Sequence, residues 1–308
     1  QNGSPVVPNK PTTIIMLAQA RRAQSTLVKR FDVKKFKSLL ETKSVGRSIK
    51  YVDITTSTMD EADKFLKDGC NSGAVVLADS QTDGRGRNQR PWLSSSGENL
   101  YVSFILRTNT IREVVSLNFA APLAIALAAE GTGGVKGSRI KWPNDVWVGR
   151  RKMAGVLLNT VAQAGPSGAK ISVNLGIGIN VNQDMDEVKQ SLCENGGNVA
   201  TSIYMENGRK PIEREVLLAD LCKRLEGLMS MEWNDLMDKY KNYDMLLGKE
   251  IVVMPNKKED PSTYYYAKAI EYSADGYLVV EPAKDSKRVT LSAEEVSIRP
   301  EPIEKEKD

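Results

Sequence analysis

The sequence predicts an α/β domain followed by a small β-rich domain, and three observations predict this order. Over residues 32–245, segments with the period of amphipathic helices alternate with short apolar segments typical of strands. From 246 onward, short strand-like runs are separated by turn residues such as Asp275-Gly276. The length of 308 residues also suits one large and one small domain, because single cores rarely grow past about 250–300 residues.

The first part of the large domain is expected to alternate helix and strand. Residues 33–43 have the pattern of a short helix, and 49–54 have that of a strand. Thr58 and Glu61 have the spacing of a capping box, so a helix is predicted to begin there and to end at Gly69. Further strands are expected on either side of a polar loop over 80–98, at 74–78 and 100–106.

The second part opens with a helix that is expected to be buried. Residues 113–130 are apolar on nearly every side, and the glycines that follow end this helix. Pro211 is expected to open a helix with a leucine stripe, and a last helix reaches about residue 244. Strands of the large domain are predicted over 138–141, 145–148, 152–161 and 170–181. The β-rich domain contributes strands over 249–254, 263–271, 277–281 and 287–291.

Composition excludes several kinds of site. The absence of histidine excludes Ser–His and Cys–His nucleophile systems and histidine-bound metals. Cys70, Cys193 and Cys222 are odd in number and far apart, which predicts neither a disulfide framework nor a zinc site. The net charge of +4 is too small to indicate a nucleic-acid binder from bulk charge. No apolar run approaches the ~18 residues of a membrane span, so no membrane association is expected.

The first 31 residues are basic and contain no acidic residue. This composition predicts either an organellar presequence or a disordered basic tail. The expected location is therefore the cytoplasm or a mitochondrial or other organellar matrix.

A loop near residue 90 combines glycine, arginine and tryptophan. Its glycines let backbone N–H groups approach an anion, its arginines bind phosphate, and its tryptophan adds a flat apolar surface. These residues are Gly84, Arg85, Gly86, Arg87, Arg90 and Trp92. Together they indicate a cover for a ligand with an apolar body and a phosphate. An RGG-like nucleic-acid segment or a plain solvated loop is the alternative.

The segment 171–181 alternates without a break, so that one face enters the core. The other face carries Gly176 and Gly178, with Asn180 beyond them. Two neighbouring glycines on one strand face weaken a sheet unless something packs on them. A ligand lying across the sheet would use that space, and a helix packed over the glycines is the alternative.

Two further segments carry polar residues close to these glycines in sequence. Asn144 and Asp145 follow a sharp turn at the start of a strand, a frequent place for a functional carboxylate; an Asx-type hairpin turn is the alternative. Lys152 follows in the next strand. With the two-residue period of a strand, Lys152 shares a face with Ala154, and Gly155 shares one with Leu157. Lys152 is expected at a sheet edge near the glycine strand, or else is a surface lysine.

Taken together, four segments resemble the biotin–protein ligase family. They occur in the family's order, at Gly84–Trp92, Lys141–Asp145, Lys152–Leu157 and Gly176–Asn180. The resemblance spans roughly residues 50–300. It implies a catalytic α/β (α+β) domain with a mixed sheet flanked by helices over 32–245, a C-terminal SH3-like β-barrel over 246–308, and a separate segment over 1–31.

The resemblance also assigns roles to residues. It implies biotin contacts for Ser57, Thr58, Met59, Gln81, Gly84, Arg85, Gly86, Arg87, Trp92, Lys152, Gly155, Leu157, Gly176 and Gly178. It implies contacts to ATP or the adenylate for Arg85, Arg87, Arg90, Trp92, Asn144, Lys152 and Asn180. The residues expected in catalysis are Lys152, Arg87 and Asp145. Met59 stands where the family often has Asn, so one hydrogen bond to biotin is expected to be absent.

The activity that the resemblance implies is ATP-dependent, and Mg²⁺ is expected to arrive with the ATP rather than in a site made by the protein alone. Biotin is activated as biotinyl-5′-AMP and passes to a lysine on the biotin-acceptor domain of a carboxylase. A lipoate or octanoate ligase of the same fold and a non-catalytic RNA-binding protein are the alternatives. No winged-helix pattern precedes the catalytic domain, so no specific DNA binding is expected. Monomer and homodimer both stay open.

Overall fold

The computed structural model describes residues 30–165, 168–187, 200–255, 261–285, 287–292 and 296–299. By the contacts within the chain, the described residues from Phe31 onward belong to one compact unit. The expectation for residues 1–31 falls almost wholly outside the described residues. Cys193 lies outside them too.

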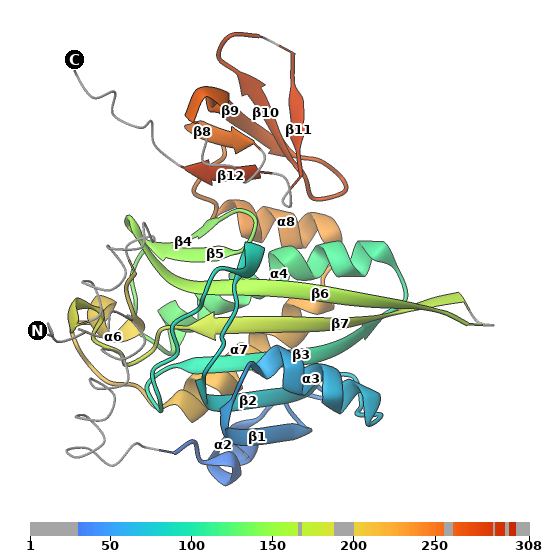
Figure 1. The fold of residues 1–308 in the computed structure, drawn as a ribbon, viewed down its shortest axis with the longest axis vertical. Coiled ribbons are helices and arrows are strands. Elements are labelled where there is room, and N and C mark those ends of the chain that lie inside the picture. Colours follow the sequence, from blue (N-terminus) through green and yellow to red (C-terminus); the bar gives the residue numbers. More distant parts are fainter. Residues whose placement is uncertain are drawn as a thin grey trace, which may run out of the picture. The chain divides into compact units, whose positions relative to one another are not determined.

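A seven-stranded sheet organises the large domain (Figure 1), with the strand order β1-β2-β3-β7-β6-β5-β4. Strands β1 and β2 pair in parallel, and all other neighbours are antiparallel, so the sheet is mixed as expected. The strands are β1 Ile49–Thr55, β2 Ala74–Gln81, β3 Leu100–Thr108, β4 Ser138–Lys141, β5 Asp145–Val148, β6 Arg151–Gly165 and β7 Gly168–Ile179. Each predicted strand is present, and the main difference is that β2 and β6 extend further.

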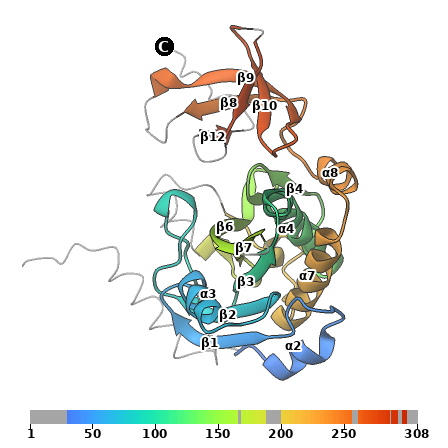
Figure 2. The same cartoon turned by 90° about the vertical axis from the view of Figure 1, so that its right-hand side faces the viewer.

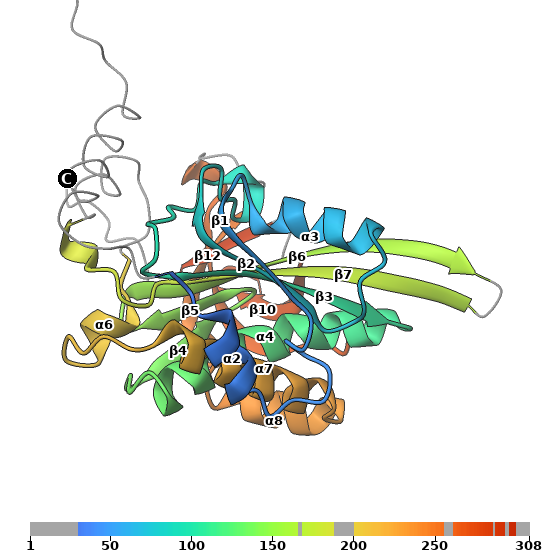
Figure 3. The same cartoon turned by 90° about the horizontal axis from the view of Figure 1, so that it is seen from below.

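Helices cover the two faces of the sheet unequally. Figures 2 and 3 show α3 on one face, with α2, α4, α7 and α8 on the other. The α-helices are α2 Val33–Leu39, α3 Thr58–Lys67, α4 Ile111–Gly131, α6 Ile203–Glu206, α7 Arg214–Met229 and α8 Trp233–Lys241. Short 3₁₀ turns occur at η1 Arg87–Gln89, η2 Met185–Glu187 and η3 Pro261–Thr263. The single helix over one face leaves part of the sheet for the site described below.

Helix α4 is the central core helix, and its residues are buried on several sides because alanines and larger apolar residues alternate around it. Thr110 and Glu113 form a capping box at its start. Within the described residues it is long and apolar enough to cross a membrane, contrary to the expectation that no segment is. Its apolar window is mostly buried inside the protein, which is the pattern of a core helix.

The helix predicted at Thr58 begins there but has a different cap, and the start predicted at Pro211 was wrong. Ser57 rather than Thr58 caps α3, because the Ser57 hydroxyl accepts the Met59 N–H; Glu61 instead pairs with Lys50 and Lys64. Helix α7 begins at Arg214 and not at Pro211. The intervening residues are held outside the helix, since Asn182 exchanges two hydrogen bonds of 2.9 Å with the backbone of Ile212.

The C-terminal residues form a five-stranded antiparallel sheet in the order β11-β10-β9-β8-β12. Its strands are β8 Glu250–Pro255, β9 Tyr265–Tyr272, β10 Leu278–Pro282, β11 Val289–Leu291 and β12 Val296–Arg299. This confirms the expected small β domain. It is joined to the large domain by aromatic contacts, because Tyr272 packs against Phe119, Trp142 and Tyr240.

Candidate functional site

The floor of the candidate site is the face of β6 and β7 that carries glycines, which meet in register. Gly155 lies opposite Gly178, and Leu157 lies opposite Gly176. The alternating apolar residues of β7, from Ile171 to Ile179, are buried on the opposite face, as predicted. The glycines therefore remove side-chain bulk from one patch of an otherwise well-packed sheet.

Different groups cover the two glycines of β7. A Cβ on Gly176 would lie 2.9 Å from Sδ of Met59, so the alternative of a helix packed on the strand is correct at this position. A Cβ on Gly178 would lie 2.6 Å from Cε2 of Trp92. The indole of the glycine- and arginine-rich loop thus rests on the patch that the sequence assigned to a ligand.

An irregularity in β6 brings Lys152 to the same patch. Val146 pairs with Ala154 but Trp147 pairs with Lys152, so Met153 is an extra residue in β6. In a regular strand Lys152 and Gly155 would face opposite sides; the extra residue places them together. The Lys152 ammonium lies 3.1 Å from where a Cβ on Gly155 would stand, and 5.2 Å from the centre of the Trp92 ring. The plain surface-lysine alternative is wrong.

Asp145 holds the Lys152 ammonium from the neighbouring strand. Its Oδ1 lies 2.7 Å from Nζ, and the two side chains are only 14% and 21% exposed, so the pair is largely shielded from water. Asp145 is the first residue of β5 and lies opposite Gly155, which is why its carboxylate reaches the floor. A cation, an anion and a flat aromatic ring therefore meet above the glycines.

The loop over Gly84–Trp92, called the flap below, is a narrow hairpin. The Trp92 N–H donates to the Gly84 carbonyl at 2.7 Å, and the Gly86 N–H donates to the Arg90 carbonyl at 2.8 Å. At the tip, Asn88 and Gln89 both have a φ of 58°, the left-handed region that lets the chain reverse direction tightly. A Cβ on Gly84 would lie 2.6 Å from the Trp92 carbonyl oxygen, so the two arms can approach only with glycine there.

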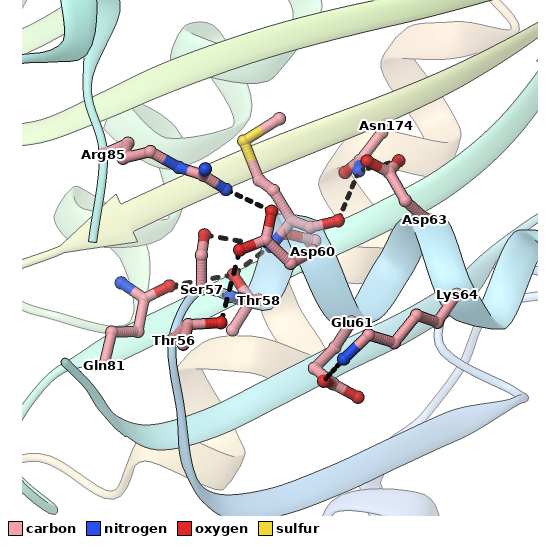
Figure 4. A network of polar contacts seen from close by, with 12 residues as sticks. Thr56, Ser57, Thr58, Asp60, Glu61, Asp63, Lys64, Gln81, Arg85 and Asn174 are labelled. Atoms are coloured by element: carbon pink, nitrogen blue, oxygen red, sulfur yellow. Dashed lines mark hydrogen bonds and ion pairs between the residues drawn. The ribbon is translucent and has the colours of Figure 1, made fainter. Parts of the chain in front are cut away.

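Side chains of the flap reach separate elements of the domain. Arg85 forms an ion pair with Asp60 in the first turn of α3, as Figure 4 shows. Arg87 donates to Oδ1 of Asn144 at 3.3 Å, and the Asn144 amide donates to the Val156 carbonyl at 2.7 Å. The flap is thus attached to the helix on one side of the floor and to the turn before β5 on the other.

The start of α3 forms a polar wall beside the floor (Figure 4). The side-chain amide oxygen of Gln81 accepts the backbone N–H of Thr58 at 2.9 Å and the Thr58 hydroxyl at 3.2 Å. The Gln81 amide donates to Ser94 at 3.1 Å, and Ser103 donates to Thr58 at 2.9 Å. Ser57 and Thr58 are 2% and 3% exposed, so helix capping and the wall use the same buried hydroxyls.

Three other expected site residues are placed differently. Asn180 is buried, and its amide donates to the Thr201 carbonyl at 2.9 Å, which fixes the segment before α6. Arg90 is exposed near the flap tip. Leu157 is half-buried opposite Gly176, next to the Met59 side chain.

Sequence reasoning missed several residues that shape the site. Asp60 anchors Arg85, Ser103 supports Thr58, and Tyr101 lies opposite Gly178 in β3. Asp63 and the Met59 carbonyl accept the Asn174 amide at 2.7 and 2.9 Å. The strand alternation contained part of this signal, because Tyr101 and Ser103 have the same two-residue spacing as the glycines.

The described cysteines do not belong to the site. Cys70 and Cys222 are buried and free, and burial raises the pKa of each thiol. A buried thiol with a raised pKa is a poor nucleophile. The chemistry of the site must come from its cations, its carboxylate and a bound reactant.

Comparisons with known proteins agree with this geometry. The model of the biotin/lipoate A/B protein ligase family matches residues 51–180. The bifunctional ligase/repressor BirA of Bacillus spizizenii is 30% identical over 255 residues, which cover 81% of this chain and 74% of that protein. Human biotin–protein ligase is 26% identical over 233 residues, or 72% of this chain and 31% of that protein.

A solved structure has the same arrangement. The biotin protein ligase of Aquifex aeolicus in complex with biotin and ATP has a TM-score of 0.64 and 25% identity, covering 83% of this chain and all of that one. The extent of the Bacillus match decides the assignment: the chain belongs to the biotin/lipoate A/B protein ligase family, among its biotin–protein ligases.

Proposed function

We propose that this chain is a biotin–protein ligase, which activates biotin with ATP and transfers it to a lysine of an acceptor protein. The observation that carries the proposal is the convergence of Lys152, Asp145 and Trp92 on the glycine floor formed by Gly155 and Gly178. Once Trp92 shifts away from Gly178, the fused rings of biotin would lie between the glycines and the indole, and the carboxylate of biotin would meet the lysine. The relatives named above are ligases of this kind.

The first step forms a mixed anhydride. The biotin carboxylate oxygen attacks the α-phosphorus of ATP, the bond to the bridging oxygen breaks, and pyrophosphate leaves with the electron pair. No proton transfer and no covalent enzyme intermediate are needed, which suits a site without histidine or a reactive cysteine. The protein has to bring two anions together, so positioning and charge neutralisation carry the catalysis.

The cations above the floor can supply this neutralisation. Lys152 is proposed to contact the biotin carboxylate and the α-phosphate, and its poorly exposed position strengthens such a contact. Arg87 is proposed to face the adenylate from the flap, and contacts of Arg85 with biotin and the adenylate stay predictions, since its guanidinium pairs with Asp60. Asn144 connects Arg87 to the strand beneath it. Contacts from Arg90 and Asn180 to the nucleotide stay predictions.

Magnesium is proposed to accompany ATP as the phosphates' own counterion. Within the described residues, no three Asp, Glu or Cys side chains gather as a metal site would require. Asp145 already faces the Lys152 ammonium. Mg²⁺ commonly binds through substrate phosphates with one or two carboxylates, so the ion belongs to the substrate here and no step is routed through a protein-held metal.

The second step transfers biotin to the acceptor. The neutral amine of the acceptor lysine attacks the carbonyl carbon of the anhydride, AMP leaves, and the amine loses one proton. We propose that Asp145 orients the incoming amine and receives that proton. Its present pairing with Lys152 supports this role, because it shows that an ammonium group can reach this carboxylate.

The acceptor is proposed to be the biotin domain of a carboxylase. The proposed location is the cytoplasm or an organellar matrix, and fusion of residues 1–31 to a fluorescent reporter would test the organellar alternative. These two proposals rest on the family and on the basic N-terminal composition, respectively.

Pyrophosphate release from ATP tests the function directly. We expect release that depends on biotin, with little release when lipoate or octanoate replaces it. Addition of a biotin-acceptor domain should then yield the domain with a covalent biotin, detected by mass spectrometry. Release with lipoate or octanoate but not with biotin would contradict the proposal.

A further inference from the structure

We infer that Asp60 is a positioning residue: it tethers the flap through Arg85 and so retains the adenylate intermediate on the enzyme. The inference rests on the proposed function and deepens it. Asp60 itself does not touch the floor; it forms an ion pair with Arg85 from the first turn of α3.

The two arms of the flap are hydrogen-bonded to each other, so a contact that holds one arm also restrains the other. The arms are joined by the hydrogen bonds between Trp92 and Gly84 and between Gly86 and Arg90. Arg85 also pairs with Pro91 across the hairpin, so a restraint on Arg85 restrains Trp92, the next residue on the opposite arm. The position of Trp92 over Gly178 therefore depends on where Arg85 is held.

The ion pair between Arg85 and Asp60 is placed to persist when ligands enter. Trp92 occupies the floor and has to shift when a biotin ring system binds there. Arg85 meets a full negative charge in the first turn of α3, and neither partner is among the side chains nearest to a Cβ on Gly155, Gly176 or Gly178.

Two further features of α3 favour the Asp60 carboxylate at this place. The Thr56 hydroxyl donates to its second oxygen at 3.3 Å, as Figure 4 shows. Its place in the first turn of α3 also favours a negative charge, because the helix dipole is positive there. Two side chains that are 31% and 35% exposed form a modest bond, which suits a flap that has to open for each acceptor.

The test is the release rate of labelled biotinyl-adenylate from the full chain, measured in the absence of acceptor. In Asp60→Asn we expect release to rise about threefold to tenfold, with a smaller change in the single-turnover rate of adenylate formation. Asp68→Asn removes the same charge from the exposed end of α3 and should release at the wild-type rate. Asp60→Glu keeps the charge and should restore most of the retention.

Salt and a double-mutant cycle separate tethering from a loss of structure. Salt screens an exposed ion pair, so wild-type release should quicken as salt rises, whereas Asp60→Asn should respond less. In an Arg85→Gln background, Asp60→Asn should add nothing. Equal adenylate release by wild type and Asp60→Asn would overturn the inference, and so would an Asp60→Asn effect on release that is undiminished in the Arg85→Gln background. A lower KM for ATP in Asp60→Asn would also overturn it, because Asp60 would then hold Arg85 away from the nucleotide.

The failure of the inference differs from the failure of the proposed function. If the wild-type chain makes no adenylate from biotin and ATP, both the proposed function and the tethering role of Asp60 are wrong. A wild-type chain that makes and holds the adenylate, with Asp60→Asn holding it equally well, would remove the tether alone.

Discussion

Met153 decides where the Lys152 ammonium lies, although its own side chain is buried in the core. As the extra residue of β6, it turns Lys152 onto the glycine face and within 2.7 Å of Asp145. The position of a charge relative to a reacting group matters at the scale of single ångströms. The register of β6 against β5 therefore determines which face of the sheet carries the Lys152 ammonium.

Lys152→Ala should lower adenylate formation at least tenfold, since charge-assisted hydrogen bonds are worth about 1.5–3 kcal/mol. The measurement is biotin-dependent pyrophosphate release. Because the substitution leaves Asp145 without this ammonium, Lys152→Ala/Asp145→Asn checks that the loss is not a folding effect. Lys170→Ala, an exposed lysine at the far end of β7, is the control and should behave as wild type. Near-normal release by Lys152→Ala would remove Lys152 from the mechanism.

Gly178→Val should lower biotin affinity at least tenfold, about 1.4 kcal/mol or more. A Cβ there would lie 2.6 Å from the Trp92 ring, and a branched side chain fills the space a ligand would use. Titration calorimetry with biotin measures the effect. Gly227→Val on α7 is the control, since a Cβ there meets nothing within 4 Å. Unchanged biotin binding would show that the ligand site is not on this floor.

Elements of the fold are joined by side chains that cap exposed backbone. Glu226 of α7 accepts the N–H groups of Lys43, Ser44 and Val45 at 2.7, 2.7 and 2.9 Å. This carboxylate connects the loop before β1 to the helix layer. Arg214, at the start of the same helix, pairs at 2.8 Å with Asp79 of β2, and both are buried. Helix α7 is thus fixed at two points, by charges that the sequence pattern did not associate.

Glu226 should make the stability of the chain depend on pH in the acid range. Burial alone would raise the pKa of the Glu226 carboxyl, but the backbone N–H groups and the Ser44 hydroxyl outweigh it and hold the pKa at about 2. A folded-state pKa below the unfolded value gives a contribution that is complete above the unfolded value, near 4.5, and is lost as pH falls toward 2.

Urea unfolding of Glu226→Gln measures this dependence. The variant should unfold at a lower urea concentration than wild type at pH 6, and the gap should narrow between pH 4.5 and pH 2.5. Glu41→Gln, an exposed glutamate near the same loop, is the control and should show a smaller gap at pH 6. A constant gap at every pH would contradict the assignment to the charged carboxylate.

The contact between the two sheets is aromatic at its centre. Trp142 is buried, donates its indole N–H to the Gly276 carbonyl at 3.2 Å, and packs on Tyr272. Phe119, Tyr240 and Trp233 extend this cluster into α4 and α8. A motif residue that the sequence grouped with the catalytic segment therefore has a structural role, attaching the small domain to the large one.

Trp142→Phe should destabilise the whole unit by about 1–3 kcal/mol, because it leaves the buried Gly276 carbonyl without this donor and removes aromatic area. The urea midpoint measures it. Trp147→Phe is the matched control: this indole is equally buried, but its N–H has no hydrogen-bond partner among the described residues. Equal destabilisation by the two substitutions would show that the hydrogen bond to Gly276 contributes nothing.

The sequence alone determined the elements, their order and the chemical types at the site. The spacing of apolar residues and the residues that end helices and strands are local features. The strands from Ile49 to Ile179, the buried helix α4 and the β-rich end were therefore predictable. The resemblance also named Lys152, Trp92, Gly155 and Gly178, which the structure brings together. Each of these features depends on residues close together in the sequence and not on contacts between distant segments.

Only the tertiary structure decided which of these residues meet. The partnership of Arg85 with Asp60, the cap at Ser57 and the rest position of Trp92 on Gly178 all join residues separated in sequence or shifted by one. The extra residue in β6 reversed a face that strict alternation would have given to Lys152. Strand register and side-chain pairing depend on the packed sheet as a whole, and no local pattern encodes them.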